Sequence, residues 1–179
     1  MFFIEVVLPL AVAKTFTYQV SQAEYAFVQQ GMRVAVPFGK TKIYTALILN
    51  KHQQEPLLYQ AKEIHQILDN APVVTSIQIQ HWQWISEYYM CSLGEVFKCA
   101  LPSALLLESE TVIYSNQSGE NSQDQLTDDE FLILEALSFQ TQLKIEDVAS
   151  ILHKKNVLPV VQSLIQKQLI SVKEELQIG

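Results

Sequence analysis

Cysteine is scarce in this 179-residue sequence, which contains only Cys91 and Cys99 and no Cys-x-x-Cys pair. Two cysteines are too few for a disulfide framework or a four-cysteine zinc site. The four histidines are scattered along the chain, and none lies beside residues that would complete a metal site. The sequence therefore predicts neither a metal site nor a disulfide, and it favours a reducing, cytoplasmic location.

Long hydrophobic runs are also missing. The apolar start, residues 1–13, is interrupted by Glu5 and Pro9 and lacks the basic residues that begin a signal peptide. An edge or barrel strand is the better interpretation of this segment. No apolar run reaches the roughly 18 residues that a membrane helix requires. We therefore expect no membrane partner.

The chain lacks a recognisable catalytic centre. Gly39-Lys40-Thr41 resembles the end of a phosphate-binding loop. Such a loop needs a second glycine where Val34 stands and a helix afterwards, whereas strand-like sequence follows here. No histidine stands in the context of a general base, and the acidic run 128–130 is explained by its place at a helix start. We predict that the chain is not an enzyme and binds no cofactor.

Basic charge is limited and unevenly placed. Residues 1–105 carry seven Lys/Arg and seven Asp/Glu, whereas residues 106–179 carry five Lys and twelve Asp/Glu, so the whole net charge of −7 lies in the second part. Neither part has the basic excess of a protein that neutralises many phosphates. Any nucleic-acid site is therefore expected to be small and local.

The first part of the chain is rich in short β-type segments. Runs of Val, Ile, Thr, Tyr and Phe between turn residues predict strands at 2–8, 15–20, 32–38 and 43–50, and a further extended segment at 59–68. From Thr75 or Ser76 the apolar spacing becomes helical, and a second helix is expected at 94–100, ending before Pro102. The apolar positions of the first helix are Ile77, Trp82, Ile85, Tyr88 and Tyr89. We predict an α+β domain over 1–105, a small antiparallel, OB-like barrel with helices.

The second part, 106–179, has the pattern of a winged helix. A lone strand at 110–114 and a polar loop or tether at 115–125 precede a capping box of Thr127 and Glu130, with a hydrophobic staple from Leu126 to Phe131. Three short helices then precede a strand at 169–172. Their apolar positions are Phe131, Leu134 and Leu137; Ile145, Val148, Ala149 and Leu152; and Val157, Val160, Val161 and Leu164. Pro159 fits the first turn of the third helix.

Two segments of the first part carry residues suited to binding. In Lys14-Thr15-Phe16-Thr17-Tyr18, two aromatic rings lie on one face of a strand next to a cation, as in barrels that stack single-stranded bases. The alternative is that both rings are core residues of a half-buried strand. The second segment, 33–40, ends at a Pro-Phe-Gly turn, where a glycine permits close approach of a ligand and is also ordinary turn chemistry.

The chain resembles the amino-terminal, non-motor portion of PriA-type replication-restart helicases. The matching segments, in order, are Val7-Leu8-Pro9-Leu10, Thr15-Phe16-Thr17-Tyr18, Gly31-Met32-Arg33-Val34-Ala35-Val36-Pro37-Phe38-Gly39-Lys40, Lys62 before Ile67-Leu68-Asp69, Glu87-Tyr88-Tyr89, and Leu93-Gly94-Glu95-Val96-Phe97 with Ala100-Leu101-Pro102. They spread over about 100 residues. Residues 126–172 match the family's winged helix by pattern alone.

The resemblance implies a DNA-binding function. It implies that residues 1–105 recognise the 3′ end of the nascent strand at a stalled or branched replication fork. The implied contacts are Phe16, Thr17, Tyr18, Gly39 and Lys62, with Lys14, Arg33 and Lys40 as backbone contacts. Thr17 replaces the family's usual aspartate, so it keeps a hydroxyl hydrogen bond but loses the strength of a charge-assisted one.

The resemblance also implies cofactors and partners for the family. Full-length members use ATP, Mg and Zn, but the motor and the cysteine-rich zinc insertion are not in this sequence. The implied partners are single-stranded 3′ ends and fork junctions of DNA, other primosome proteins and single-strand-binding protein. The alternative function is a protein-interaction module, in which the acidic winged helix docks onto a helicase motor or a primosome partner.

Overall fold

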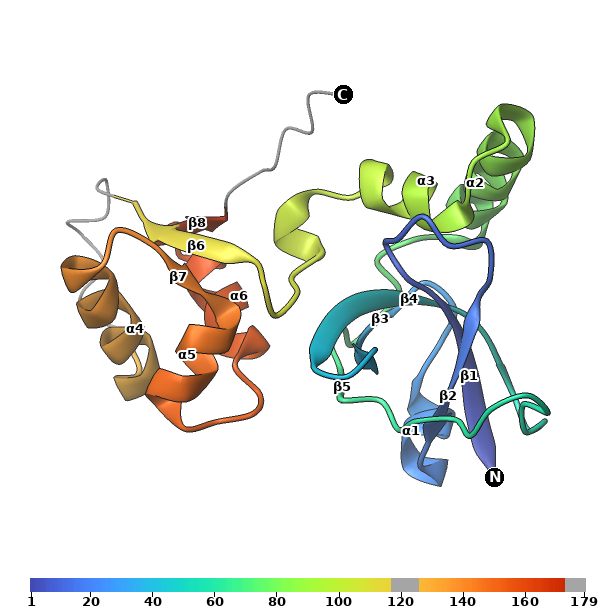
Figure 1. Ribbon diagram of the computed structural model, residues 1–179, viewed down its shortest axis with the longest axis horizontal. Helices are drawn as coiled ribbons and strands as arrows, with labels where there is room; N and C mark the ends of the chain where they lie inside the picture. The colour runs from blue at the N-terminus through green and yellow to red at the C-terminus, as the bar shows by residue number, and fades with distance from the viewer. Residues whose placement is uncertain (117–125, 173–179) are drawn as a thin grey trace. The chain divides into compact units, whose positions relative to one another are not determined.

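The computed structural model describes residues 1–116 and 126–172 (Figure 1). The chain divides into two compact units, Met1–Leu106 and Leu107–Gly179, each with its own core. We call them the first and second units and describe each by itself.

The first unit is built on a curled five-stranded antiparallel sheet with the order β2-β1-β4-β3-β5 (Figure 1). Its strands are β1 (Phe2–Val7), β2 (Phe16–Val20), β3 (Arg33–Phe38), β4 (Lys42–His52) and β5 (Gln66–Ile67). The four strands expected from β-type runs are confirmed. The segment expected to extend over 59–68 contributes only the two residues of β5 and one isolated parallel bridge, Gln19 to Glu63.

Both faces of this sheet are buried. Alternate residues of β1 divide between two clusters, with Ile4 and Val6 inside the curl and Val7 on the outer face. The inner cluster also contains Tyr18, and the outer cluster is covered by two helices. Because both faces are covered, the strands read as nearly continuous apolar runs rather than strict alternation.

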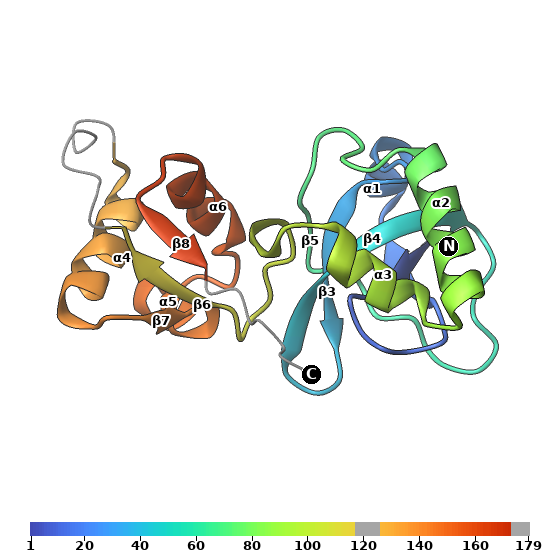
Figure 2. The same cartoon turned by 90° about the horizontal axis from the view of Figure 1, so that it is seen from above.

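The helices α2 (Ser76–Tyr89) and α3 (Leu93–Ala100) lie side by side over the outer face (Figure 1 and Figure 2). Each begins with a capping box, at Thr75 and Ser92 respectively. Gly94 lets α3 approach the chain after β1, since a Cβ there would stand 2.3 Å from the carbonyl oxygen of Leu8. Close backbone contact therefore explains this glycine.

The buried face of α2 differs from the predicted one. Ile79 and Trp82 are buried, while Ile77, Tyr88 and Tyr89 are exposed. The expectation that these three side chains form the apolar face is wrong, because α2 rests on the sheet along a narrow stripe. The short helix α1 (Gln22–Phe27) was not expected, although its capping box, Ser21 with Glu24, is present in the sequence.

The second unit is a winged helix. Its strands β6 (Val112–Ser115), β7 (Leu143–Lys144) and β8 (Ile170–Val172) pair in the order β7-β6-β8, and its helices are α4 (Asp128–Phe139), α5 (Ile145–Leu152) and α6 (Leu158–Gln166). The three helices, the final strand, the Thr127–Glu130 capping box and Pro159 in the first turn of α6 are confirmed.

Two details of the second unit correct the sequence analysis. Phe131 is 58% exposed, and α4 instead buries Glu130, Ile133 and Leu137, so its inward face is rotated from the expected one. Of the residues expected in a tether, Ser115 belongs to β6, and Asn116 follows it, with its backbone amide donating to the Leu169 carbonyl over 2.9 Å. The rest of that expected tether, 117–125, lies outside the described residues.

Across the residues that the structure describes, no helix is long and apolar enough to cross a membrane.

Candidate nucleic-acid interface

The outer edge of β2 brings the predicted binding residues together. The backbone amide of Gln19 donates to the Lys62 carbonyl over 2.8 Å, and the amide of Ile64 donates to the Gln19 carbonyl over 3.3 Å. These bonds align the segment 62–64 with β2. They carry Lys62 to the strand that holds Phe16 and Thr17.

Lys62 also reaches the turn between β3 and β4. Its Nζ donates to the carbonyl oxygen of Gly39 over 2.9 Å. Gly39 is exposed, has a φ of +70°, and faces open space, since a Cβ there would meet no atom within 4 Å. A left-handed φ favours glycine. Lys62 therefore connects the β2 edge to a turn whose backbone is accessible to a ligand.

Tyr18 is a core residue of the curl. Its side chain is 4% exposed, and its hydroxyl donates to the Pro37 carbonyl over 2.8 Å. Burial, together with the nearby Tyr59 phenol, raises the pKa of Tyr18 to about 12, so the hydroxyl remains protonated at neutral pH. The expectation that the Tyr18 ring stacks on a base is wrong, because the side chain is buried in the inner core cluster.

Phe16 lies at the margin of the same core. It is partly buried, and its ring meets Phe38 edge to face, with 5.1 Å between ring centroids and 75° between planes. Phe38 in turn contacts Tyr44. Of the two predicted rings, Phe16 is thus the one left partly accessible, at the end of β2 next to the Gly39 turn.

Thr17 has a partner that the sequence did not indicate. Its backbone amide donates to the hydroxyl of Tyr59 over 2.9 Å, and Tyr59 is 46% exposed. Tyr59 stands three residues before Lys62 and gave no motif of its own. A family resemblance that includes Lys62 was the only signal near it. We name Phe16, Thr17, Gly39, Tyr59 and Lys62 the β2-edge site.

The predicted backbone contacts separate into two groups. Lys14 and Lys40 are exposed. Arg33 is 5% exposed, and its guanidinium forms an ion pair with Asp69, with 2.7 Å from Nη2 to Oδ1 and 3.0 Å from Nε to Oδ2. Its Nη1 donates to the Leu105 carbonyl. Arg33 therefore holds the first unit together, and its predicted contact with a DNA backbone is wrong.

Comparison with known proteins identifies the family of the domain that contains the β2-edge site. Residues 5–102, more than half of the chain, match the family model of the PriA 3′ DNA-binding domain. The chain belongs to the PriA family. Residues 110–175 match a second family model, described as a winged helix domain.

Three replication restart proteins PriA are among the similar curated proteins of this family. Identity is 26% over 104 residues to that of Treponema pallidum, 37% over 78 to that of Haemophilus influenzae, and 28% over 97 to that of Bacillus subtilis. These matches cover 56%, 44% and 54% of this chain but only 16%, 11% and 12% of the relatives. The chain therefore corresponds to a small part of those PriA proteins.

Polar side chains at the third helix of the winged helix form contacts within the second unit. In this PriA-family chain, buried Glu130 of α4 accepts from Ser163 Oγ over 2.6 Å and from Lys167 Nζ over 2.7 Å. Lys154, just before α6, pairs with Asp129. Ser163 and Lys167 thus hold α6 against α4, and Lys154 joins the segment before α6 to α4.

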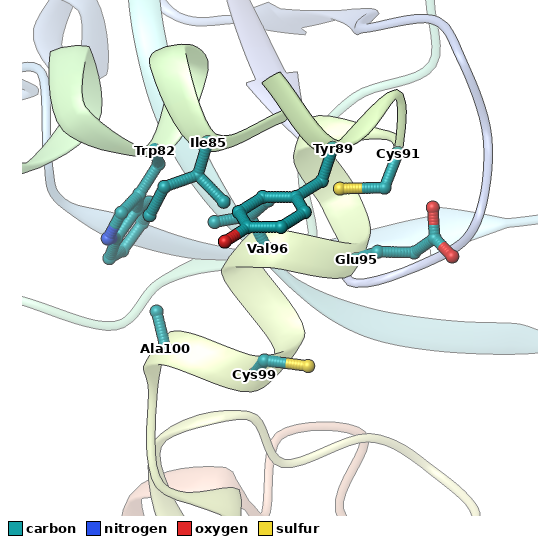
Figure 3. Close-up of a pocket in the computed structure, with 8 residues that line it drawn as sticks. All are labelled: Trp82, Ile85, Tyr89, Cys91, Glu95, Val96, Cys99 and Ala100. Atoms are coloured by element: carbon teal, nitrogen blue, oxygen red, sulfur yellow. The ribbon is translucent and has the colours of Figure 1, made fainter. Parts of the chain in front are cut away.

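A separate apolar groove lies between α2 and α3 of the PriA-family chain (Figure 3). Its volume is about 390 Å³. It is lined by Trp82, Ile85, Tyr89, Cys91, Glu95, Val96, Cys99 and Ala100. The lining contains no basic side chain and one carboxylate, so it does not favour an anionic DNA backbone. The β2-edge site remains the better candidate for nucleic acid.

Proposed function

We propose that the first unit binds the 3′ end of a single DNA strand at the β2-edge site, as a non-motor part of a replication-restart protein. The observation that carries this proposal is the position of Lys62. Its backbone pairs with β2 and its Nζ bonds to the Gly39 carbonyl. Lys62 thus places a cation between the edge of β2 and the Gly39 turn, which faces open space.

The site is suited to one terminal nucleotide rather than to a long track. Phe16 supplies a partly accessible ring for base contact. Lys62, Lys40 and Lys14 supply a few cations, and the Gly39 backbone permits close approach. Family membership supports the same reading, because the matched model is described as a 3′ DNA-binding domain.

Replacing Lys62 tests the proposal. Lys62→Ala is expected to weaken binding of a fluorescent, 3′-hydroxyl single strand by about tenfold or more, since hydrogen bonds to charged groups contribute about 1.5–3 kcal/mol. Fluorescence anisotropy measures the dissociation constant. EDTA is expected to leave the affinity unchanged, because we propose binding without a metal or nucleotide cofactor.

Lys98→Ala is the matched control. Lys98 is exposed on α3, away from β2 in the sequence and on a different element. Lys51 is unsuitable, because its Nζ donates to the carbonyls of Tyr25 and Val28 at the end of α1. Equal losses in Lys62→Ala and Lys98→Ala would mean that charge alone, rather than the β2-edge site, determines binding.

A second function is favoured for the second unit by its charge. Residues 106–179 carry twelve acids and five Lys, and Lys144, Lys154 and Lys167 form ion pairs within the unit. A field of that sign slows association with duplex DNA. We propose that this unit docks onto protein, either a helicase motor or a primosome partner.

Duplex binding distinguishes groove reading from docking. A fragment of residues 107–179, checked for its fold by circular dichroism, is expected to bind a plain 20-base-pair duplex more weakly than about 10⁻⁴ M at physiological salt, the weak end of non-specific binding. A dissociation constant in the low micromolar range would reverse this assignment. It would return α6 to the major-groove role typical of winged helices.

A further inference from the structure

The Thr17 backbone amide points away from the sheet. Gln19, two residues further along β2, makes its backbone hydrogen bonds outward to Lys62 and Ile64. In a strand, residues i and i+2 direct their amide and carbonyl groups to the same side. The Thr17 amide therefore also lies on the outer edge of β2, beyond the reach of β1.

The backbone hydrogen bonds between segment 62–64 and β2 do not extend to Thr17. A backbone carbonyl would be the ordinary acceptor for the Thr17 amide, but a side-chain hydroxyl, that of Tyr59, takes the place at 2.9 Å. An exposed backbone amide on a sheet edge is a ready donor for an incoming group. The phenol thus occupies the position from which a ligand oxygen would accept this hydrogen bond.

The segment that carries Tyr59 is weakly held. Leu57 is 100% exposed, Leu58 is 92% exposed and Tyr59 is 46% exposed. Segments with few buried apolar contacts open at low free-energy cost. Tyr59 can therefore leave Thr17 without disturbing the core that holds Tyr18.

A hydroxyl ligand fits this exchange. The phenol oxygen and a sugar hydroxyl are both neutral acceptors of similar size, so exchanging one for the other on the Thr17 amide conserves the number of hydrogen bonds. The displaced phenol is exposed and finds water. The Lys62 and Gly39 groups beside it are positioned to meet the rest of the nucleotide.

We propose that Tyr59 is an affinity-determining residue of the β2-edge site, whose hydroxyl holds the place of the ligand's terminal hydroxyl on the Thr17 amide until a strand end displaces it. This inference rests on the proposed function. In this proposal Tyr59 competes with the ligand and lowers its affinity. The strand end is bound by the backbone amide of Thr17 rather than by its side chain.

Tyr59→Phe isolates the hydroxyl from the ring. In the full chain, this variant is expected to bind a 3′-hydroxyl single strand about two- to tenfold more tightly than the wild type, the range that one net hydrogen bond is worth. Tyr88→Phe is the matched control, because Tyr88 is 67% exposed on α2 and lies outside the site. It is expected to leave the affinity unchanged.

A second readout follows the Thr17 amide directly. In ¹H–¹⁵N spectra of the free chain, its resonance is expected to shift in Tyr59→Phe and not in Tyr88→Phe. On saturation with the oligonucleotide, wild type and Tyr59→Phe are expected to converge, because the same ligand oxygen then accepts the bond in both.

The outcomes separate the two proposals. If wild type and Tyr59→Phe bind equally, or if Tyr59→Phe binds more weakly, the competitive role of Tyr59 is wrong and the proposed function stands. If neither protein binds the single strand, the proposed function is wrong and this inference fails with it.

Discussion

At the residue scale, side-chain burial separates the roles of neighbouring residues that the sequence pattern treats alike. Phe16 and Tyr18 share one face of β2, but Tyr18 is fixed in the core and Phe16 lies at its margin. Arg33 and Lys62 are both cations in segments that resemble the PriA family, but Arg33 forms an ion pair with Asp69. Lys62 instead contacts the Gly39 turn. The sequence pattern could not distinguish the members of these pairs, because strand alternation predicts which face a side chain lies on and not how deeply it is buried.

Tyr18→Phe tests the core role of Tyr18. The substitution keeps the ring but leaves the Pro37 carbonyl without its donor. Because this hydrogen bond is part-buried and a typical one contributes about 0.5–1.5 kcal/mol, we expect the free energy of unfolding to fall by about that amount in urea titrations. An unchanged stability combined with weaker DNA binding would show that the Tyr18 hydroxyl serves the ligand and not the fold.

At the element scale, strands and capped helices were predictable and their inward faces were less so. β-type runs located β1 to β4, helical apolar spacing after Thr75 located α2, and a capping box located α4. The face of α4 was predicted wrongly because a carboxylate, Glu130, is among its buried residues. Hydrophobic spacing cannot anticipate a buried acid, since its burial depends on partners from α6. The position of Tyr59 beside Thr17 was equally inaccessible, because it depends on a tertiary hydrogen bond across 42 residues.

The contact between α4 and α6 predicts a pH dependence. Burial alone would raise the pKa of Glu130, but hydrogen bonds from Lys167, Ser163 and the Thr127 amide outweigh it and lower the pKa to about 2 from 4.5. A lowered pKa stabilises the folded unit above about pH 4.5, and that stability is lost as pH falls toward 2. The loss is expected to be about 3 kcal/mol.

Calorimetric unfolding of the full chain at stepped pH measures this effect. Glu130→Gln is expected to be less stable at neutral pH and to lack this part of the acid dependence, because it cannot ionise. If the variant and the wild type lose stability in parallel between pH 4.5 and 2, the contact between α4 and α6 does not depend on the Glu130 charge.

At the scale of the whole molecule, the two units differ in net charge. Residues 1–105 are electrically neutral and carry the β2-edge site, whereas residues 106–179 hold the whole net charge of −7. This difference in charge could be predicted from the sequence, and so could the presence of a barrel-like domain followed by a winged helix. The neutral first unit suits recognition of a strand end, in which a few specific contacts replace a long phosphate track.

The comparison of two strand ends tests the central claim most directly. The dissociation constants of the full chain are measured by fluorescence anisotropy for single strands of one sequence ending in a 3′-hydroxyl or in a 3′-dideoxynucleotide, at one salt concentration. We expect binding about two- to tenfold tighter for the hydroxyl end, because the dideoxy end has no oxygen to accept from the Thr17 amide. Equal affinities, or tighter binding of the dideoxy end, would contradict recognition of a 3′-hydroxyl at the β2-edge site.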